Sequence, residues 1–151
     1  MTQNKLDFLL GQSEEQINEI YNFNVQAFAD SQDFAWTKEN IKKEIGKGWN
    51  LYSAKVDKEI VCVIFTKKEG HQLLTKNTPI RIDFQGQGFS HLIKDFYETM
   101  ASKNDIDEIV NYCPTDNFRM ISLNEGHNYK KTGKILGPKK NILEWVKPWK
   151  K

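Results

Sequence analysis

Apolar residues return with a helical period along one stretch in the second half of the chain. Their intervals of three and four residues run through Phe89, Leu92, Ile93, Phe96, Tyr97 and Met100. Because an α-helix turns about once every 3.6 residues, these side chains share one face. The pattern therefore predicts a helix that packs this face on a core, with Gly86 and Gly88 at its entrance.

Two shorter helices are predicted nearer the N-terminus. A capping box spans Ser13 to Gln16, in which the serine hydroxyl accepts from a first-turn amide and the glutamine reaches back. The helix that it opens is expected to end before Asp30. A second helix is expected to begin after Thr37, as its cap, and to stop at Gly46.

The period then changes to that of β-strands. The runs 51–56 and 59–66 indicate a hairpin that turns at residues 57–58. Another strand is expected from about Gln72 to Ile82, with its ladder interrupted at Pro79, which has no amide hydrogen.

The elements after the long helix complete the predicted fold class. A short strand is expected from Ile106 to Tyr112, and the order strand, helix, strand implies a parallel crossover. A short helix should open at 115–117, and strands at 129–136 and 141–146 end the chain. The sequence therefore predicts an α/β domain with a mixed sheet.

Length and charge narrow the classes of function. The chain has 151 residues, which fits one domain spanning 1–151. Its net charge of +2 argues against a dedicated nucleic-acid coat, so nucleic acid is not the expected partner. The charge is uneven, however. Residues 130–151 hold eight lysines and one glutamate, a net charge of +7, which leaves −5 on residues 1–129.

Other residue types exclude further classes. No apolar run approaches the roughly 18 residues of a membrane span, and the first ten residues lack the apolar stretch of a signal peptide. Cys62 and Cys113 are expected to be buried in a reducing cytoplasm. The three histidines have no metal-ligand spacing, so no metal is predicted. We expect a cytoplasmic protein that does not insert into membranes.

The glycine turn before the long helix is the segment that offers chemistry. Glycine lets the backbone approach a ligand closely, and the first amides of a helix attract an anion such as a pyrophosphate. The pattern Gly86-Gln87-Gly88 is weak alone, because a dinucleotide fingerprint needs glycine at His91 and a Walker loop needs Gly-Lys-Ser/Thr. On this pattern alone, a simple tight turn is the favoured interpretation of these glycines.

A wider pattern favours ligand binding. The run Gln85-Gly86-Gln87-Gly88-Phe89-Ser90 resembles the acetyl-CoA motif Gln/Arg-x-x-Gly-x-Gly/Ala of the GNAT N-acetyltransferase family. The later stretch 117–125, followed by an aromatic residue at 129, is similar to a second motif of that family, in which an asparagine opens a short helix. The order of elements also agrees over nearly the whole chain.

This resemblance implies a fold, a cosubstrate and a reaction. The fold would be a mixed, mostly antiparallel sheet with a splayed parallel strand pair, flanked by helices. Acetyl-CoA would bind in the splay and give its acetyl group to an amine of a small molecule or a protein. The sequence leaves the oligomeric state open, with a homodimer as one alternative. The cofactor-binding residues implied are Ile80, Arg81, Ile82, Gln85, Gly86, Gln87, Gly88, Phe89, Ser90, Asn117 and Asn124.

The family pattern is not fully kept, and the departure at Asn124 limits the catalytic prediction. Ser90 replaces the last Gly/Ala of the first motif, and Asn124 stands where many members have a tyrosine that protonates the departing thiolate. An asparagine amide can only hydrogen-bond there. The alternative function is therefore a non-catalytic acyl-CoA-binding or regulatory protein of the same fold.

The catalytic residues themselves stay unknown at this point. Glu44, Glu69 and His71 are candidate bases by position alone, and each is more simply a solvated surface group. A third hypothesis is an interaction module that uses the lysines of 130–151 on phosphates or an acidic partner. A solvated strand face explains those lysines more simply.

Overall fold

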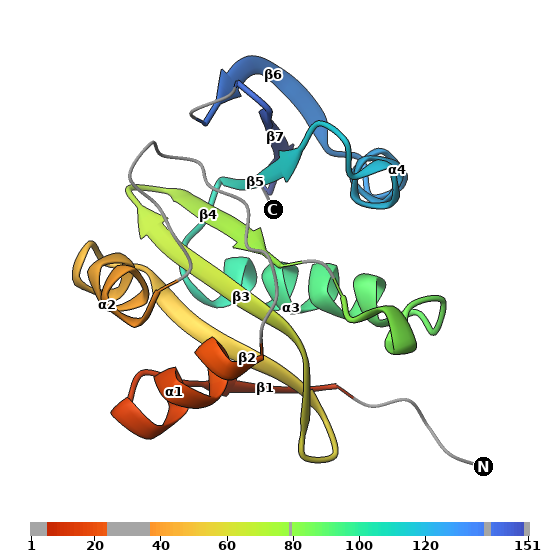
Figure 1. Cartoon of the computed structure of the whole chain (residues 1–151). Helices are drawn as coiled ribbons and strands as arrows, with labels where there is room; N and C mark the ends of the chain where they lie inside the picture. The colour runs from red at the N-terminus through yellow and green to blue at the C-terminus, as the bar shows by residue number, and fades with distance from the viewer. Residues whose placement is uncertain (1–5, 24–36, 79, 138–139, 150–151) are drawn as a thin grey trace.

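The computed structural model describes residues 6–23, 37–78, 80–137 and 140–149. Within this part of the chain a seven-stranded sheet carries two helices on each face (Figure 1). Six of the seven strands were predicted at about their observed positions. The seven strands are β1 (Asp7–Leu10), β2 (Asn50–Val56), β3 (Glu59–Glu69), β4 (Gln72–Asn77), β5 (Glu108–Pro114), β6 (Lys130–Leu136) and β7 (Ile142–Pro148).

The strand order confirms the predicted mixed sheet. The order is β1-β2-β3-β4-β5-β7-β6, and neighbouring strands are antiparallel except for the parallel pair β4 and β5. The long helix α3 (Phe89–Lys103) connects the two parallel strands, as the predicted crossover requires.

The sheet has a separate core on each face, because successive side chains along a strand point to opposite faces. On β3, Cys62 and Ile64 pack in the core that includes α3 and α4 (Phe118–Gly126). Their neighbours Val63 and Phe65 pack in the opposite core, with α1 (Glu14–Asn22) and α2 (Lys38–Gly46). The continuous apolar run in β3 is thus explained by burial on both sides.

The parallel strands separate at one end. Their register runs from Gln72 opposite Glu108 to Thr75 opposite Asn111 and stops there. β4 continues to Asn77 on the β3 side, whereas β5 continues to Pro114 on the β7 side. In Figure 1 the strands β5, β7 and β6 turn away from the rest of the sheet. The predicted splay is confirmed.

The predicted end of the fourth strand is wrong. β4 ends at Asn77, and Ile82–Phe84 forms a 3-10 turn instead of extended backbone. The chain beyond β4 contacts β3 only intermittently, since Thr78 and Arg81 donate their amides to Val63 and Val61. The sequence has a proline at position 79, a residue type that has no amide hydrogen to donate to a ladder, so an early end of the strand agrees with the sequence.

Two other boundaries differ from the sequence prediction. β1 was not predicted, because it is four residues long and Leu9 and Leu10 are exposed, so no apolar alternation marks it. α1 ends at Asn22 rather than near Asp30, which lies outside the described residues. The caps at Ser13 and Thr37 are confirmed.

Candidate functional site

A glycine turn shapes the approach to α3. The side-chain amide of Gln85 donates to the carbonyl of Ile80 at 2.8 Å and closes the turn between them. Gly86 and Gly88 have φ values of 79° and 84°, a region that residues with a side chain rarely adopt. A Cβ added at either glycine would meet no protein atom within 4 Å. The backbone here is therefore open to a ligand.

The N-terminus of α3 differs from those of the other described α-helices. Ser13, Thr37 and Asn117 each accept a hydrogen bond from a first-turn amide of α1, α2 and α4. The residue before α3 is Gly88, which has no capping side chain, and the first turn of α3 contains no acidic residue. The positive end of the helix dipole thus lies beside the turn without a side-chain acceptor at the cap.

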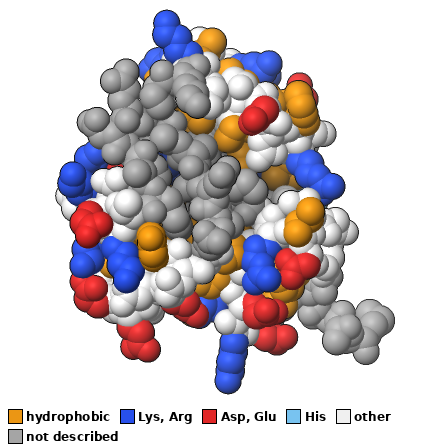
Figure 2. All heavy atoms as spheres, in the orientation of Figure 1, with side chains coloured by type: hydrophobic (Ala, Val, Ile, Leu, Met, Phe, Trp, Pro, Cys, Tyr) orange, Lys and Arg blue, Asp and Glu red, His pale blue; other side chains and the backbone are white. Residues whose placement is uncertain are grey.

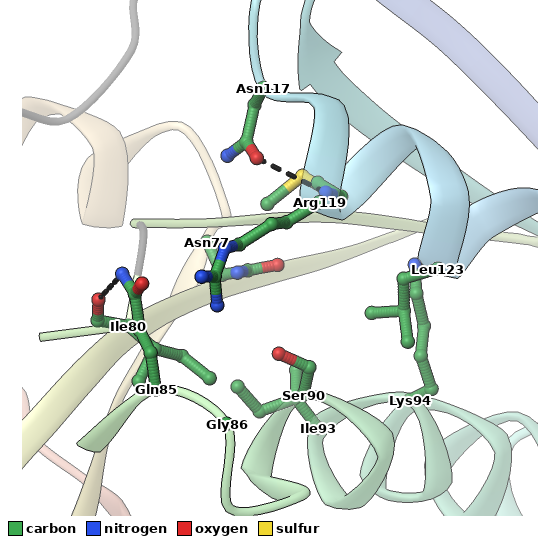
Figure 3. A pocket seen from close by; sticks show the side chains of 11 residues that line it. Asn77, Ile80, Gln85, Gly86, Ser90, Ile93, Lys94, Asn117, Arg119 and Leu123 are labelled. Atoms are coloured by element: carbon green, nitrogen blue, oxygen red, sulfur yellow. Dashed lines mark hydrogen bonds between the residues drawn. The ribbon is translucent and has the colours of Figure 1, made fainter. Parts of the chain in front are cut away.

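An inner hollow of about 80 Å³ lies between this turn, the end of β4, α3 and α4. Figure 3 shows the guanidinium of Arg119 extending across it, and Lys94 reaching from α3 towards α4 beside Leu123. Polar and apolar side chains share its wall, which is made by Asn77, Ile80, Gln85, Gly86, Ser90, Ile93, Lys94, Asn117, Arg119, Met120 and Leu123.

A wider hollow of about 890 Å³ continues outward from it, since both share Ile80, Gly86, Ser90, Arg119 and Leu123. Its outer wall comes from the α3 entrance and from the exposed side of α4, and includes Phe84, Gly88, Phe89, His91, Phe118, Ser122, Gly126 and His127. The two hollows together give a path from solvent to the end of β4 at Asn77.

Two histidines lie at the rim of the wider hollow. Nδ1 of His91 and Nε2 of His127 are 2.9 Å apart. Burial lowers the pKa of His127, and the neighbouring His91 and Lys94 lower it further. One ring is therefore neutral when it accepts a hydrogen bond from the other.

Comparison with solved structures identifies this architecture. The ribosomal-protein-S18-alanine N-acetyltransferase of Escherichia coli superimposes with a TM-score of 0.74 at 11% identity, over 97% of this chain and 96% of that one. The spermidine N-acetyltransferase of Vibrio cholerae, solved with CoA and spermine, gives 0.73 at 10% identity, over 97% of each chain. The paiA N-acetyltransferase of Thermoplasma acidophilum, solved with CoA, gives 0.70 at 12% identity, over 95% and 99%.

The chain has the GNAT fold. The fold that the sequence motifs implied is thus confirmed, at identities far too low for the neighbours to assign a substrate. No protein-family model matches the sequence, and no curated protein sequence matches it.

Most of the predicted cofactor residues of this GNAT fold line the two hollows. Five are on the inner wall: Ile80, Gln85, Gly86, Ser90 and Asn117. Gly88 and Phe89 are on the wall of the wider hollow. Arg81, Ile82, Gln87 and Asn124 are on neither wall.

The sequence misplaced Arg81 and Ile82 because it extended β4 too far. The Arg81 guanidinium turns outward to Asp83, at 3.3 Å, and the 3-10 turn leaves Ile82 86% exposed. Neither residue lies on a strand edge, and their part in cofactor binding stays a prediction of the resemblance. The end of β4 itself, at Asn77, lines the inner hollow in their place.

Asn124 lies beneath the inner hollow in a buried polar chain. Its Oδ1 accepts from Nζ of Lys94 at 2.5 Å, and its Nδ2 donates to Oδ1 of Asn111 at 3.2 Å. Asn111 in turn donates to the hydroxyl of Thr75, so the chain joins α3, α4 and the parallel strand pair. Each of these side chains is at most 2% exposed.

Lys94 is the site residue that sequence reasoning missed. It follows Ile93 and precedes Tyr97 by three positions, which places it at the border of the apolar stripe. Burial lowers its pKa from 10.5 to about 7. The spacing to Tyr97 was the available signal, but a lysine at such a border normally extends to solvent.

The three candidate bases lie elsewhere. Glu44 is buried, contrary to the expectation of a solvated group, and pairs with Lys76 at 2.7 Å. Glu69 pairs with Lys67 at the turn between β3 and β4. His71 lies beside Asp105. None of the three lines either hollow.

Two further observations concern the described residues alone. Cys62 and Cys113 are free and buried. Among those residues no helix is long and apolar enough to cross a bilayer.

Proposed function

We propose that this protein is an acetyl-CoA-dependent N-acetyltransferase, with residues 1–151 acting as one domain. The observation that carries the proposal is the path formed by the two adjoining hollows, from the uncapped N-terminus of α3 to the end of β4, the strand that separates from β5 there. Solved structures of the same fold with CoA bound support it. The length of chain shared with those neighbours supports the single domain.

The residues present fit CoA. The amides of the turn from Gln85 to Ser90 and the dipole of α3 suit its pyrophosphate, and a Cβ-free surface at Gly86 and Gly88 lets that group approach. Phe118, 76% exposed at the wider hollow, presents a face for its adenine. Arg119 adds positive charge to both hollows.

The acceptor is an amine of a small molecule or of a protein. Both kinds occur among the structural neighbours, one named for a ribosomal-protein alanine and another for spermidine. Transfer needs a neutral amine beside the thioester, and holding both reactants in one site contributes several kcal/mol through orientation. A panel of polyamines, amino acids and peptide N-termini identifies the acceptor class.

Isothermal titration with acetyl-CoA tests the proposal. The wild-type chain should bind, and Gly88→Val should lose about 10-fold or more in affinity, because the new side chain enters the path and strains a positive φ. Gly133→Val is the matched control, since Gly133 has a φ of 93° and equally open space but lies on neither wall. Absence of binding by the wild-type chain would refute the proposal.

The alternative is an acyl-CoA-binding or regulatory protein without turnover. Asn124 favours it, because an amide cannot protonate a thiolate. CoA binding with no acetylation across the amine panel would support this alternative, whereas acetylation of any amine in the panel would exclude it.

A further inference from the structure

Lys94 is a buried cation at the inner end of the path. Its side chain is 2% exposed and forms part of the wall of the inner hollow (Figure 3). An ammonium group carries three N–H donors, and Asn124 Oδ1 accepts one of them. Nζ also lies 4.2 Å from the ring centroid of Tyr129, which favours a cation at that point.

The hydrogen bond from Lys94 to Asn124 places the lysine where a proton donor is expected in this fold family. Asn124 is the residue that replaces the proton-donating tyrosine of the resemblance, and its short side chain contacts Nζ directly. The Lys94–Asn124 pair therefore brings an exchangeable proton to the region where the asparagine alone has none to give. Its anchor on Asn111 fixes the pair at the splay of β4 and β5.

We propose that Lys94 is the general acid that protonates the departing CoA sulfur, an inference that rests on the proposed function. The substrate nitrogen forms a bond to the acetyl carbon, and the carbon–sulfur bond breaks with its electron pair going to sulfur. A proton moves from Lys94 Nζ to that sulfur, giving the CoA thiol and a neutral lysine. The proton released by the substrate nitrogen reaches solvent, from which Lys94 is reprotonated.

The surroundings of Lys94 make it a suitable acid. Burial lowers its pKa to about 7, below the value of about 8.5 for an ordinary thiol, so proton transfer to a thiolate is downhill. The charged and titratable groups that face it are Tyr97 and Glu98 on α3, Cys113 on β5, Lys147 on β7, and His127 and Tyr129 between α4 and β6. Burial raises the pKa of Cys113 to about 12, which keeps that neighbour neutral.

Lys94→Gln separates this role from a structural one. Glutamine retains an N–H donor for Asn124 but has no proton to transfer. We expect kcat to fall by about 100-fold with KM within about two-fold, because the lost interaction acts in the transition state. The falling limb of the kcat–pH profile above about pH 7 should also disappear. Lys94→Met, which conserves the side-chain volume, should behave in the same way.

Lys103→Gln is the matched control. It removes an exposed lysine from the last turn of the same helix and should leave both kcat and the pH profile unchanged. Thermal unfolding shows whether each variant is folded. A folded Lys94→Gln protein with wild-type kcat and an unchanged alkaline limb would overturn the proposal.

A second measurement needs no turnover. The Lys94 side-chain signal, assigned by its loss in Lys94→Gln, is titrated by NMR with CoA or with desulfo-CoA bound. A sulfur in contact with Nζ should shift the lysine titration with CoA, and its removal should abolish that shift. Identical titrations with both ligands would overturn the inference while leaving the proposed function intact. Failure of wild-type protein to bind either ligand would instead refute the function and the inference with it.

Discussion

At the scale of single residues, Lys94 links burial to the pH dependence of stability. The pKa of Lys94 is about 7 in the folded protein, against an ordinary value of 10.5. Between these pH values the unfolded chain binds one more proton than the folded chain. The free energy of unfolding should therefore rise with pH in this window, by at most about 1.4 kcal/mol per pH unit. Below pH 7 the folded chain carries the full destabilisation from burying a charged lysine.

Lys94→Met removes this linkage. The stability of the wild-type chain relative to the variant should increase from pH 7 to pH 9, because titrations of groups that do not interact with Lys94 cancel in the difference. Urea denaturation of both proteins at the two pH values measures it. A stability difference that stays the same at both pH values would contradict a lowered pKa for Lys94.

The same residue shows what a sequence can and cannot reveal about a site. Gly86, Ser90 and Asn117 were predicted because they fall in two short sequence motifs that resemble those of the GNAT family, and all three line the inner hollow. The buried position of Lys94 in the site depends on its hydrogen bond to Asn124, thirty positions away, and on the packing of three elements around it. Such a contact has no local pattern, so the resemblance implied Asn124 as a cofactor residue and left Lys94 out.

At the scale of secondary-structure elements, Asn117 has two roles. Its Oδ1 accepts from the amide of Met120 at 3.1 Å and caps α4, while the residue also lines the inner hollow. Asn117→Asp keeps the capping acceptor but replaces the amide donor with negative charge. We expect its stability to stay within about 0.5 kcal/mol of wild type and its CoA affinity to fall, since a carboxylate repels the phosphates.

Thr37→Ala is the control, with the opposite expected result: a loss of stability and no loss of CoA affinity. It removes the cap of α2, which lies on neither hollow, and should cost about 1 kcal/mol without changing CoA affinity. Denaturation and titration calorimetry on both variants measure the two effects. Wild-type CoA affinity in Asn117→Asp would show that the amide does not face the cosubstrate.

Elements with local signals were predicted well, and those defined by tertiary pairing were not. Capping residues and apolar periodicity located α1, α2 and α3 at their N-termini. The end of β4 depends on where β3 stops accepting its amides, and β1 exists only as a partner of β2. The error at β4 propagated into the site, because it placed Arg81 and Ile82 on a strand edge.

At the scale of the whole molecule, most of the basic charge lies away from the site, although Lys147 on β7 acts on Lys94 at the inner hollow. The lysine-rich residues 130–151 supply β6 and β7, whereas the two hollows lie between α3, α4 and the end of β4. On the face in Figure 2, acidic and basic side chains are interspersed. The excess of lysine is thus placed away from the proposed phosphate site, and recognition there falls to backbone amides, the α3 dipole and Arg119.

This separation predicts which charges control CoA binding. Arg119→Gln should weaken binding by about 10-fold or more, because hydrogen bonds to a charged group contribute about 1.5–3 kcal/mol. Replacing two exposed lysines of β6 by glutamate, in Lys130→Glu and Lys134→Glu, lowers the net charge by four units, which disfavours an anion such as CoA at long range. Affinity should nevertheless change by less than about two-fold at physiological salt, where exposed charges are screened beyond about 8 Å.

Titration calorimetry of the two proteins at matched ionic strength decides between local and long-range attraction. A large loss in the lysine variant with a small loss in Arg119→Gln would mean that the basic end of the chain steers the cosubstrate. The opposite result would restrict phosphate recognition to the wall of the hollows. The β6 lysines would then be a solvated strand face, as their exposure and their absence from both walls indicate.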